Sequence, residues 1–156
     1  MKQFIRVAMP IVALVFSAVM AQADGQNIGA CDPVQVVLGE NGGNAFTAVA
    51  PSQIQLRHGA FVDAIILNGR RHGGTGGNAT GVLQLRAEEY INRMVVRHGR
   101  FVDRIEITTN FGRSLSGGGN GGNVTALNNI RVLTLGGRSG QFLDQIQVTY
   151  CRNYRH

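Results

Sequence analysis

The sequence of 156 residues contains no tryptophan, two cysteines, three prolines and a single lysine, Lys2. Without a second lysine the rest of the chain cannot form a phosphate-binding loop, which places a lysine against the phosphates. Cys31 and Cys151 lie far apart with no histidine beside either, so they do not form a recognised metal-ligand spacing. We therefore expect neither a metal site nor a cofactor.

Long apolar segments are also absent, apart from one at the start. The stretch from Val7 to Met20 is almost entirely apolar, follows two basic residues and precedes Ala21-Gln22-Ala23, which fits the cleavage site of a secretory signal. It is shorter than the roughly 20 residues that a membrane-spanning helix needs. We predict a signal peptide at residues 1–23, a lead-in at 24–32 and a folded domain at 33–152. The protein would be secreted or periplasmic, without a transmembrane anchor.

Arginine supplies nearly all of the positive charge. Of the 15 basic residues, two lie in the predicted signal, which leaves 13 against nine acidic ones. A basic surface can attract acidic glycans or nucleic acid. The arginines are scattered, with no run longer than Arg70-Arg71, so we favour a solvated surface and expect no nucleic acid partner.

The two cysteines lie near the two ends of the predicted mature chain. An even pair in an oxidising compartment is typical of a disulfide. We predict one disulfide, between Cys31 and Cys151, joining the first and last strands.

A threefold repeat dominates what the chain does contain. In each copy a glycine is followed by phenylalanine two places later and by aspartate four places later. The motifs are Gly59-Ala60-Phe61-Val62-Asp63, Gly99-Arg100-Phe101-Val102-Asp103 and Gly140-Gln141-Phe142-Leu143-Asp144. Their glycines lie 40 and 41 residues apart, which indicates an internal repeat of about 40 residues.

Apolar residues alternate with others after each motif. They occupy the same two offsets in every copy: Ile65 and Leu67, Ile105 and Ile107, and Ile146 and Val148. A period of two indicates a strand, and further β-prone segments at 82–85, 90–96 and 130–135 precede the motifs. No segment after residue 24 sustains an amphipathic helical pattern. We predict an all-β domain with short strands and glycine-rich turns.

A pair of glycines followed by asparagine opens each repeat. The pairs are Gly42-Gly43, Gly76-Gly77 and Gly121-Gly122. Glycine enters backbone conformations closed to other residues and lets a ligand approach bare amides. A single pair is explained as well by a hairpin turn, but three equivalent pairs favour a repeated functional loop.

The three motif aspartates indicate binding rather than catalysis. Hydrolysis of a glycosidic bond needs two carboxylates facing one bond, whereas Asp63, Asp103 and Asp144 would lie in separate, equivalent sites. A carboxylate can accept paired hydrogen bonds from adjacent sugar hydroxyls while loop amides donate to the same sugar. We expect a non-enzymatic, sugar-binding protein.

Taken together, these motifs and their surroundings resemble the jacalin-related lectins, over roughly Val34 to Tyr150. The stretches that carry the resemblance are Glu89-Tyr90-Ile91, Arg97 to Arg113 and Gly137 to Asp144. The resemblance implies a β-prism of the first type, with three four-stranded Greek-key sheets about a pseudo-threefold axis and the first and last strands in one sheet. It also implies that a sugar lies between a Gly-x-x-x-Asp loop and the glycine loop adjacent in space.

By this resemblance the chain has three candidate carbohydrate sites. The best joins Gly140, Gln141, Phe142 and Asp144 to Gly42 and Gly43. The second joins Gly59, Ala60, Phe61 and Asp63 to Gly76 and Gly77. The third joins Gly99, Arg100, Phe101 and Asp103 to Gly121 and Gly122, and ranks last because the segment from Ser116 to Asn120 is expected to form an extended loop. The phenylalanines would offer an apolar face to the sugar or belong to the core.

The chain is unbroken through Gly42-Gly43. In this feature it resembles the mannose- and glucose-binding branch of the family rather than the galactose-binding one.

Two alternatives remain. One is a prism with degenerate sugar loops that mediates protein contacts or assembles into a homo-oligomer. The other is binding of acidic polysaccharide through arginines, with these candidates: Arg70, Arg71, Arg93, Arg97, Arg100 and Arg104. The lack of tryptophan argues against a β-trefoil, and three repeats are too few for a propeller.

Overall fold

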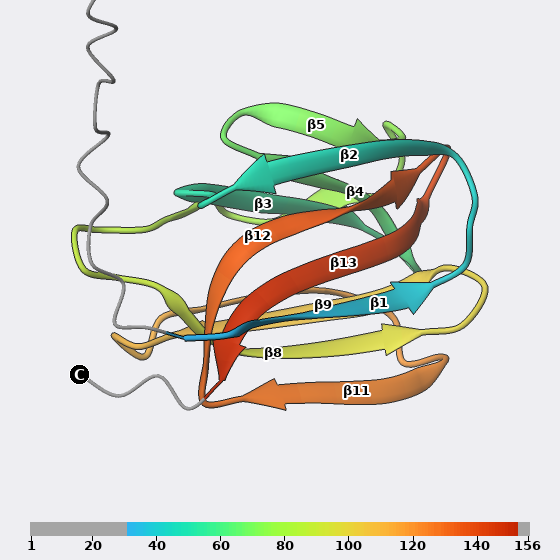
Figure 1. Cartoon of the computed structure of the whole chain (residues 1–156). Coiled ribbons are helices and arrows are strands. Elements are labelled where there is room, and N and C mark those ends of the chain that lie inside the picture. Colours follow the sequence, from blue (N-terminus) through green and yellow to red (C-terminus); the bar gives the residue numbers. More distant parts are fainter. Residues whose placement is uncertain (1–30, 153–156) are drawn as a thin grey trace, which may run out of the picture.

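The computed structural model describes residues 31–152, and the regular secondary structure of this range consists of β-strands (Figure 1). No helix in this range is long and apolar enough to cross a membrane. The predicted signal peptide, at residues 1–23, lies outside the described residues, as does most of the predicted lead-in.

The strands run along the chain in the following order. They are β1 (Pro33–Gly39), β2 (Asn44–Val49), β3 (Gln53–His58), β4 (Val62–Leu67), β5 (Arg70–Gly73), β6 (Asn78–Ala79), β7 (Leu83–Gln84), β8 (Ile91–His98), β9 (Val102–Thr109), β10 (Ser114–Gly118), β11 (Asn123–Asn128), β12 (Ile130–Ser139) and β13 (Leu143–Arg152).

Three antiparallel sheets form the molecule (Figure 1). Sheet I has the order β1-β13-β12-β2, sheet II has β5-β4-β3 followed by β6 and β7, and sheet III has β10-β9-β8-β11. In sheets II and III three consecutive strands form a meander, and the next strand returns to pair with the first of the three, which is a Greek key. The predicted all-β fold with three such sheets is confirmed.

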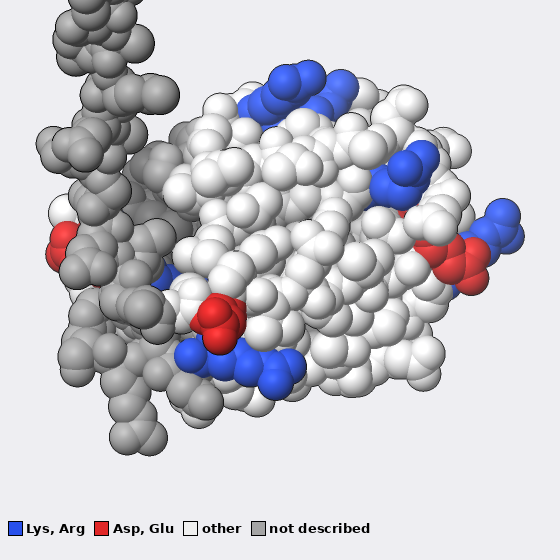
Figure 2. All heavy atoms as spheres, in the orientation of Figure 1, with Lys and Arg blue, Asp and Glu red and all other residues white. Residues whose placement is uncertain are grey.

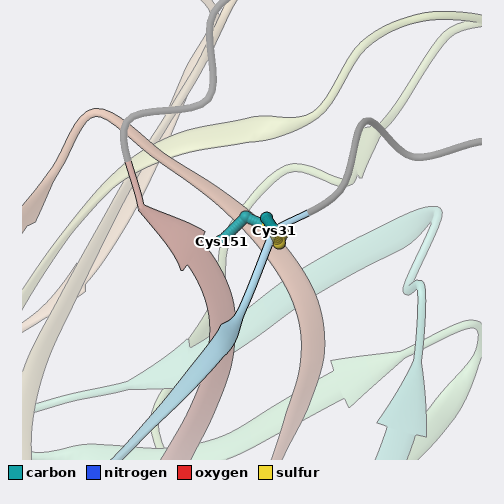
Figure 3. Close-up of a disulfide and its surroundings, with 2 residues drawn as sticks. All are labelled: Cys31 and Cys151. Atoms are coloured by element: carbon teal, nitrogen blue, oxygen red, sulfur yellow. A yellow bond between two sulfur atoms is a disulfide. The ribbon is translucent and has the colours of Figure 1, made fainter.

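Sheet I reaches the same order with strands from both ends of the chain. β12 and β13 form its central hairpin, while β1 and β2 from the start of the domain supply its two edges. The register places Pro33 opposite Cys151, and the predicted disulfide joins Cys31 to Cys151 beside this pair (Figure 3). The first and last strands are therefore linked covalently as well as by hydrogen bonds.

The core lies between the three sheets and follows the period-two pattern of the sequence. The predicted alternating residues of β4, β9 and β13 are all at most 1% exposed: Ile65, Leu67, Ile105, Ile107, Ile146 and Val148. Burial of each such side chain stabilises the fold by about 1.5 to 3 kcal/mol. One face of every sheet thus contributes to a common interior.

Two details differ from the expectation. Ser116 to Gly118 belongs to β10, which pairs with β9, so the extended loop expected from Ser116 to Asn120 is wrong for its first half. The fourth strand of sheet II is divided into β6 and β7 because Thr80 leaves the ladder. Its hydroxyl accepts a hydrogen bond from the N–H of Leu56 at 3.0 Å, while its own N–H donates to the Leu56 carbonyl at 2.9 Å.

Candidate functional site

The three Gly-x-x-x-Asp motifs fold as the same turn. A shift of strand register precedes each one, between Arg57 and His58, between Arg97 and His98, and between Arg138 and Ser139. Such bulges re-aim the following side chains. In each turn the N–H of the motif glycine donates to the carbonyl of the motif phenylalanine at 2.9 Å. The repeat in sequence is thus a repeat of backbone geometry.

Each motif aspartate lies against one glycine pair. A methyl group on Gly76 would come within 2.5 Å of Asp63 Oδ1, and one on Gly121 within 2.6 Å of Asp103 Oδ1. A methyl group on Gly42 would likewise overlap Asp144 Oδ1. The structure therefore brings together the partners expected in each site, and only glycine fits beside each carboxylate.

The second glycine of every pair has a left-handed backbone. Its φ angle is +56° at Gly43, +64° at Gly77 and +70° at Gly122, a region that most residues with a Cβ avoid. Gly77 and Gly122 also face the other carboxylate oxygen of Asp63 and Asp103, whereas Gly43 lies on the backbone of Ser139. The loop beside Asp144 is therefore seated differently from the other two.

An arginine that precedes each motif holds the glycine loop in place. Arg57 donates from Nε to the Gly76 carbonyl at 2.8 Å and from an η nitrogen to the Gly77 carbonyl at 2.7 Å. Arg138 repeats the arrangement with Gly42 at 2.9 Å and Gly43 at 2.8 Å. The planar guanidinium suits such forked donation.

In the third repeat Arg97 makes one hydrogen bond of this kind, to the Asn120 carbonyl at 3.1 Å. Sequence reasoning missed this role in all three copies. The signal was available, because an arginine stands two residues before every motif glycine.

The carboxylates differ in their surroundings. Asp63 and Asp103 are 8% and 7% exposed, and Asp144 is half-buried. Oδ2 of Asp144 is nevertheless enclosed and has no hydrogen-bond partner among the described residues. An enclosed oxygen without a donor costs about 1 to 3 kcal/mol, more when it is charged. The Asp144 site therefore contains a carboxylate oxygen without a hydrogen-bond donor among the described residues.

The loop tips between glycine and aspartate carry Ala60, Arg100 and Gln141, all of which are exposed. Within residues 31–152 no hydrogen bond uses their N–H groups or those of the phenylalanines that follow. Each carboxylate is therefore accompanied by unpaired backbone donors on the same turn.

The three motif phenylalanines contact one another. The ring centroid of Phe61 lies 5.6 Å from those of Phe101 and Phe142, and the last two are 5.2 Å apart. The rings form a half-buried cluster where the three turns meet. This cluster, called the phenylalanine cluster below, places all three candidate sites on one end of the molecule.

None of the described residues forms a group of three or more histidine, cysteine, aspartate or glutamate side chains placed to hold a metal ion. The chemistry of these sites is therefore that of carboxylate acceptors beside amide donors, an arrangement that suits a ligand rich in hydroxyl groups.

Two comparisons of the sequence agree with this geometry. A family model described as a jacalin-like lectin domain matches residues 36–149. Griffithsin from Griffithsia sp. is 37% identical over 113 residues, which are 72% of this chain and 92% of that protein.

Solved structures of similar shape are also lectins. Malaysian banana lectin is 24% identical, with a TM-score of 0.67 over 80% of this chain and all of that one. A mannose binding jacalin related lectin from Ananas comosus is 19% identical, with a TM-score of 0.65 over 77% of this chain and 98% of that one. At these identities the likeness establishes a common fold.

Proposed function

Because the chain belongs to the jacalin-like lectin family, we propose that it is a non-enzymatic protein that binds hexoses of the mannose and glucose type at three sites. One observation carries the proposal. In each of three repeats a carboxylate lies against a glycine pair, with unpaired backbone amides on the same turn. A catalytic centre would be expected once, whereas equivalent repeated sites suit multivalent binding.

The residues of each site have complementary tasks toward a sugar. The carboxylate accepts hydrogen bonds from two neighbouring hydroxyls, and charged acceptors form stronger hydrogen bonds than neutral ones. The amides at the loop tip donate to the sugar oxygens. The bare glycine pair allows the pyranose ring to approach the backbone closely.

Similar proteins support the choice of sugar. Artocarpin, with 20% identity and a TM-score of 0.65, is a lectin with mannose specificity, and the Ananas comosus protein is mannose binding. The chain also runs unbroken from β1 to β2 through the loop of Gly42 and Gly43, which is the feature that resembles the mannose- and glucose-binding branch of the family. We therefore favour mannose and glucose over galactose.

Replacement of the aspartates tests the sites. Asp144→Asn keeps the shape of the side chain but replaces one carboxylate oxygen with a donor, and is expected to weaken monosaccharide binding without unfolding the protein. The triple variant with Asp63→Asn and Asp103→Asn added should pass through a mannose column unretained. Asp32→Asn, at an exposed position outside the strands, is the matched control. Retention of the triple variant equal to that of the parent would refute the site assignment.

General binding of acidic polymers through scattered arginines has less support. Arg93 bonds to Asn128, Arg97 to the Asn120 carbonyl, and Arg104 to Glu106 and the Gly118 carbonyl. These guanidinium groups already have partners within the chain. Competition by a neutral sugar at constant salt separates the two kinds of binding, because contacts to a polyanion weaken steeply with salt.

We also propose that the protein acts outside the cytoplasm. The disulfide between Cys31 and Cys151 is typical of oxidising compartments, and residues 1–23 have the pattern of a secretory signal. Sequencing the amino terminus of the protein recovered from the medium or periplasm tests this. Recovery of an uncleaved chain from the cytoplasm alone would contradict it.

A further inference from the structure

A polar hollow adjoins the first candidate site, between sheets I and II. It has a volume of about 450 Å³ and is lined by residues of β2, β5 and the end of β12, among them Phe46, Arg70, Arg71, His72 and Gly140. Gly140 is also the motif glycine of the Asp144 site. The hollow and the site are therefore continuous.

The lining of this hollow differs from the equivalent junction of sheets II and III. Ser139 occupies the position that His58 and His98 hold in the other repeats. Between sheets II and III the ring of His58 fills the equivalent space, so that a methyl group on Gly117 would come within 2.6 Å of it. Between sheets I and II the sizes are exchanged: Ser139 is small, and His72, which corresponds to Gly117, supplies the ring.

The strand on the other side of the hollow is basic. His72 stacks on Phe46 with the ring centroids 4.2 Å apart. Arg70 lies on the same face of β5 as His72, because these residues pair with the buried Leu67 and Ile65. Arg71, between them, points to the opposite face of β5 and borders the hollow from there. Basic side chains gather over β5 at the upper edge of Figure 2.

The charge on this strand is not neutralised within residues 31–152. Among these residues neither Arg70 nor Arg71 forms an ion pair or donates a side-chain hydrogen bond. Burial and the charge of Arg70 lower the pKa of His72. This lowering favours the neutral ring, so the positive charge beside the hollow comes from Arg70 and from Arg71 on the other face of the strand.

We propose that this hollow is a subsite for an anionic substituent, a sulfate ester or a carboxylate, on a glycan whose hexose occupies the Asp144 site. The inference rests on the proposed function and adds a preference for acidic glycans at one site of three. Arg70 lies three residues before Gly73, a span of about 10 Å along a strand, and the following Gly74 packs on the Gln141 carbonyl. A sugar attached to the bound hexose would lie along this strand.

The equivalent positions in the other repeats lack this charge. The contact of Gly119 with Asp103 matches that of Gly74 with Asp63, so Arg70 and Arg71 correspond to Leu115 and Ser116 of β10. Neither residue is basic. The acidic preference should therefore belong to the Asp144 site and not to the Asp63 site.

Titration calorimetry of the full mature chain tests the subsite with three probes: a neutral oligomannoside, the same oligosaccharide with one sulfate ester, and one with a uronate. The parent should bind one or both acidic probes about fivefold more tightly than the neutral one at low salt. Arg70→Gln/Arg71→Gln should remove this gain and leave the neutral affinity unchanged. Arg86→Gln/Arg152→Gln removes the same charge from exposed positions and should keep the gain.

The outcomes separate the subsite from the lectin site. Equal affinity of the parent for all probes, or equal loss in both double variants, overturns the subsite while the proposed function stands. Failure of the parent to bind the neutral probe overturns the proposed function. If Asp144→Asn binds the acidic probe as tightly as the parent, the anion is held independently and the coupled subsite is wrong.

Discussion

A guanidinium and a glycine with no room for a side chain determine the geometry of each candidate site. Arg57 and Arg138 each hold two carbonyls of a glycine loop, and so fix the loop against the aspartate without occupying the ligand position. The aspartates and glycines were predictable because they repeat. The arginines were mistaken for surface charge, because their partners lie 19 or more residues away.

At the residue scale, Arg138→Lys should weaken sugar binding at the first site about five- to tenfold. An ammonium group cannot donate to both loop carbonyls in the geometry of the guanidinium fork, so the loop of Gly42 and Gly43 would be less ordered. Calorimetry in a background of Asp63→Asn and Asp103→Asn isolates this site. Arg152→Lys is the control. Unchanged affinity would show that the clamp does not position the loop.

Alanine at Gly77 should cost about 1 kcal/mol or more in the free energy of unfolding and abolish binding at the Asp63 site. Its φ angle is +64°, and the added methyl group would lie 2.5 Å from Asp63 Oδ2. Gly81→Ala is a matched control, since nothing lies within 4 Å of the added carbon. Urea denaturation and sugar titration measure the two effects. Equal behaviour of both variants would contradict the proposed fit.

At the scale of the elements, the end of the prism opposite the glycine loops is held by a buried ion pair. Glu89, just before β8, accepts hydrogen bonds from the Thr109 hydroxyl at 2.6 Å and from Arg113 at 2.8 Å, and its side chain is fully buried. It joins the start of β8 to the end of β9. The stretch Glu89-Tyr90-Ile91 carries part of the family resemblance in the sequence, and this contact explains its structural role.

The buried Glu89 should make stability dependent on acid pH. Burial alone would raise its pKa, but hydrogen bonds from Thr109 and the Arg86 N–H and the charge of Arg113 outweigh burial and hold the pKa below the usual 4.5. The stabilisation is therefore present above pH 4.5 and is lost as pH falls through the lowered value.

Glu89→Gln should cost about 1.5 to 3 kcal/mol at pH 7, with the difference from the parent shrinking below pH 4.5. Urea melts at several pH values measure it. Glu106→Gln, which breaks a more exposed pair at 2.7 Å, should cost less than about 1 kcal/mol. Equal costs for both variants would refute the role of burial.

Strands were predictable where side chains alternate and not where glycine dominates. The pattern of β4, β9 and β13 depends on which residues enter the core, which is visible in the sequence. Gly117 and Gly118 have no such pattern, and they join β10 because their bare backbone fits beside the His58 ring and the Asp103 carbonyl. These contacts come from distant segments, so local reasoning predicted a loop.

At the scale of the whole molecule, the disulfide closes the fold at the end opposite the candidate sites. β1 runs from Pro33 beside Cys151 to Gly39, close to the glycine pair of the first site. Cys31→Ser/Cys151→Ser should lower the free energy of unfolding by up to about 4 kcal/mol, because it frees a long loop in the unfolded chain. Denaturation and sugar titration test this, and the affinity of the folded variant should be unchanged. A loss of affinity would show that the disulfide also maintains the geometry of the candidate sites.

The phenylalanine cluster brings the three sites together on one end of the molecule, which determines how the protein should act on branched glycans. A glycan with several terminal hexoses can occupy two or more sites, and the second contact is then intramolecular. We expect such a glycan to bind about 100-fold more tightly than the monosaccharide. Asp63→Asn/Asp103→Asn leaves one site, so it should keep the monosaccharide affinity per site and lose the gain for the branched glycan. Surface plasmon resonance with the protein immobilised at low density measures both, since sparse molecules cannot share one glycan. A gain that survives in the one-site variant would mean that the branched glycan is held by an extended single site rather than by several.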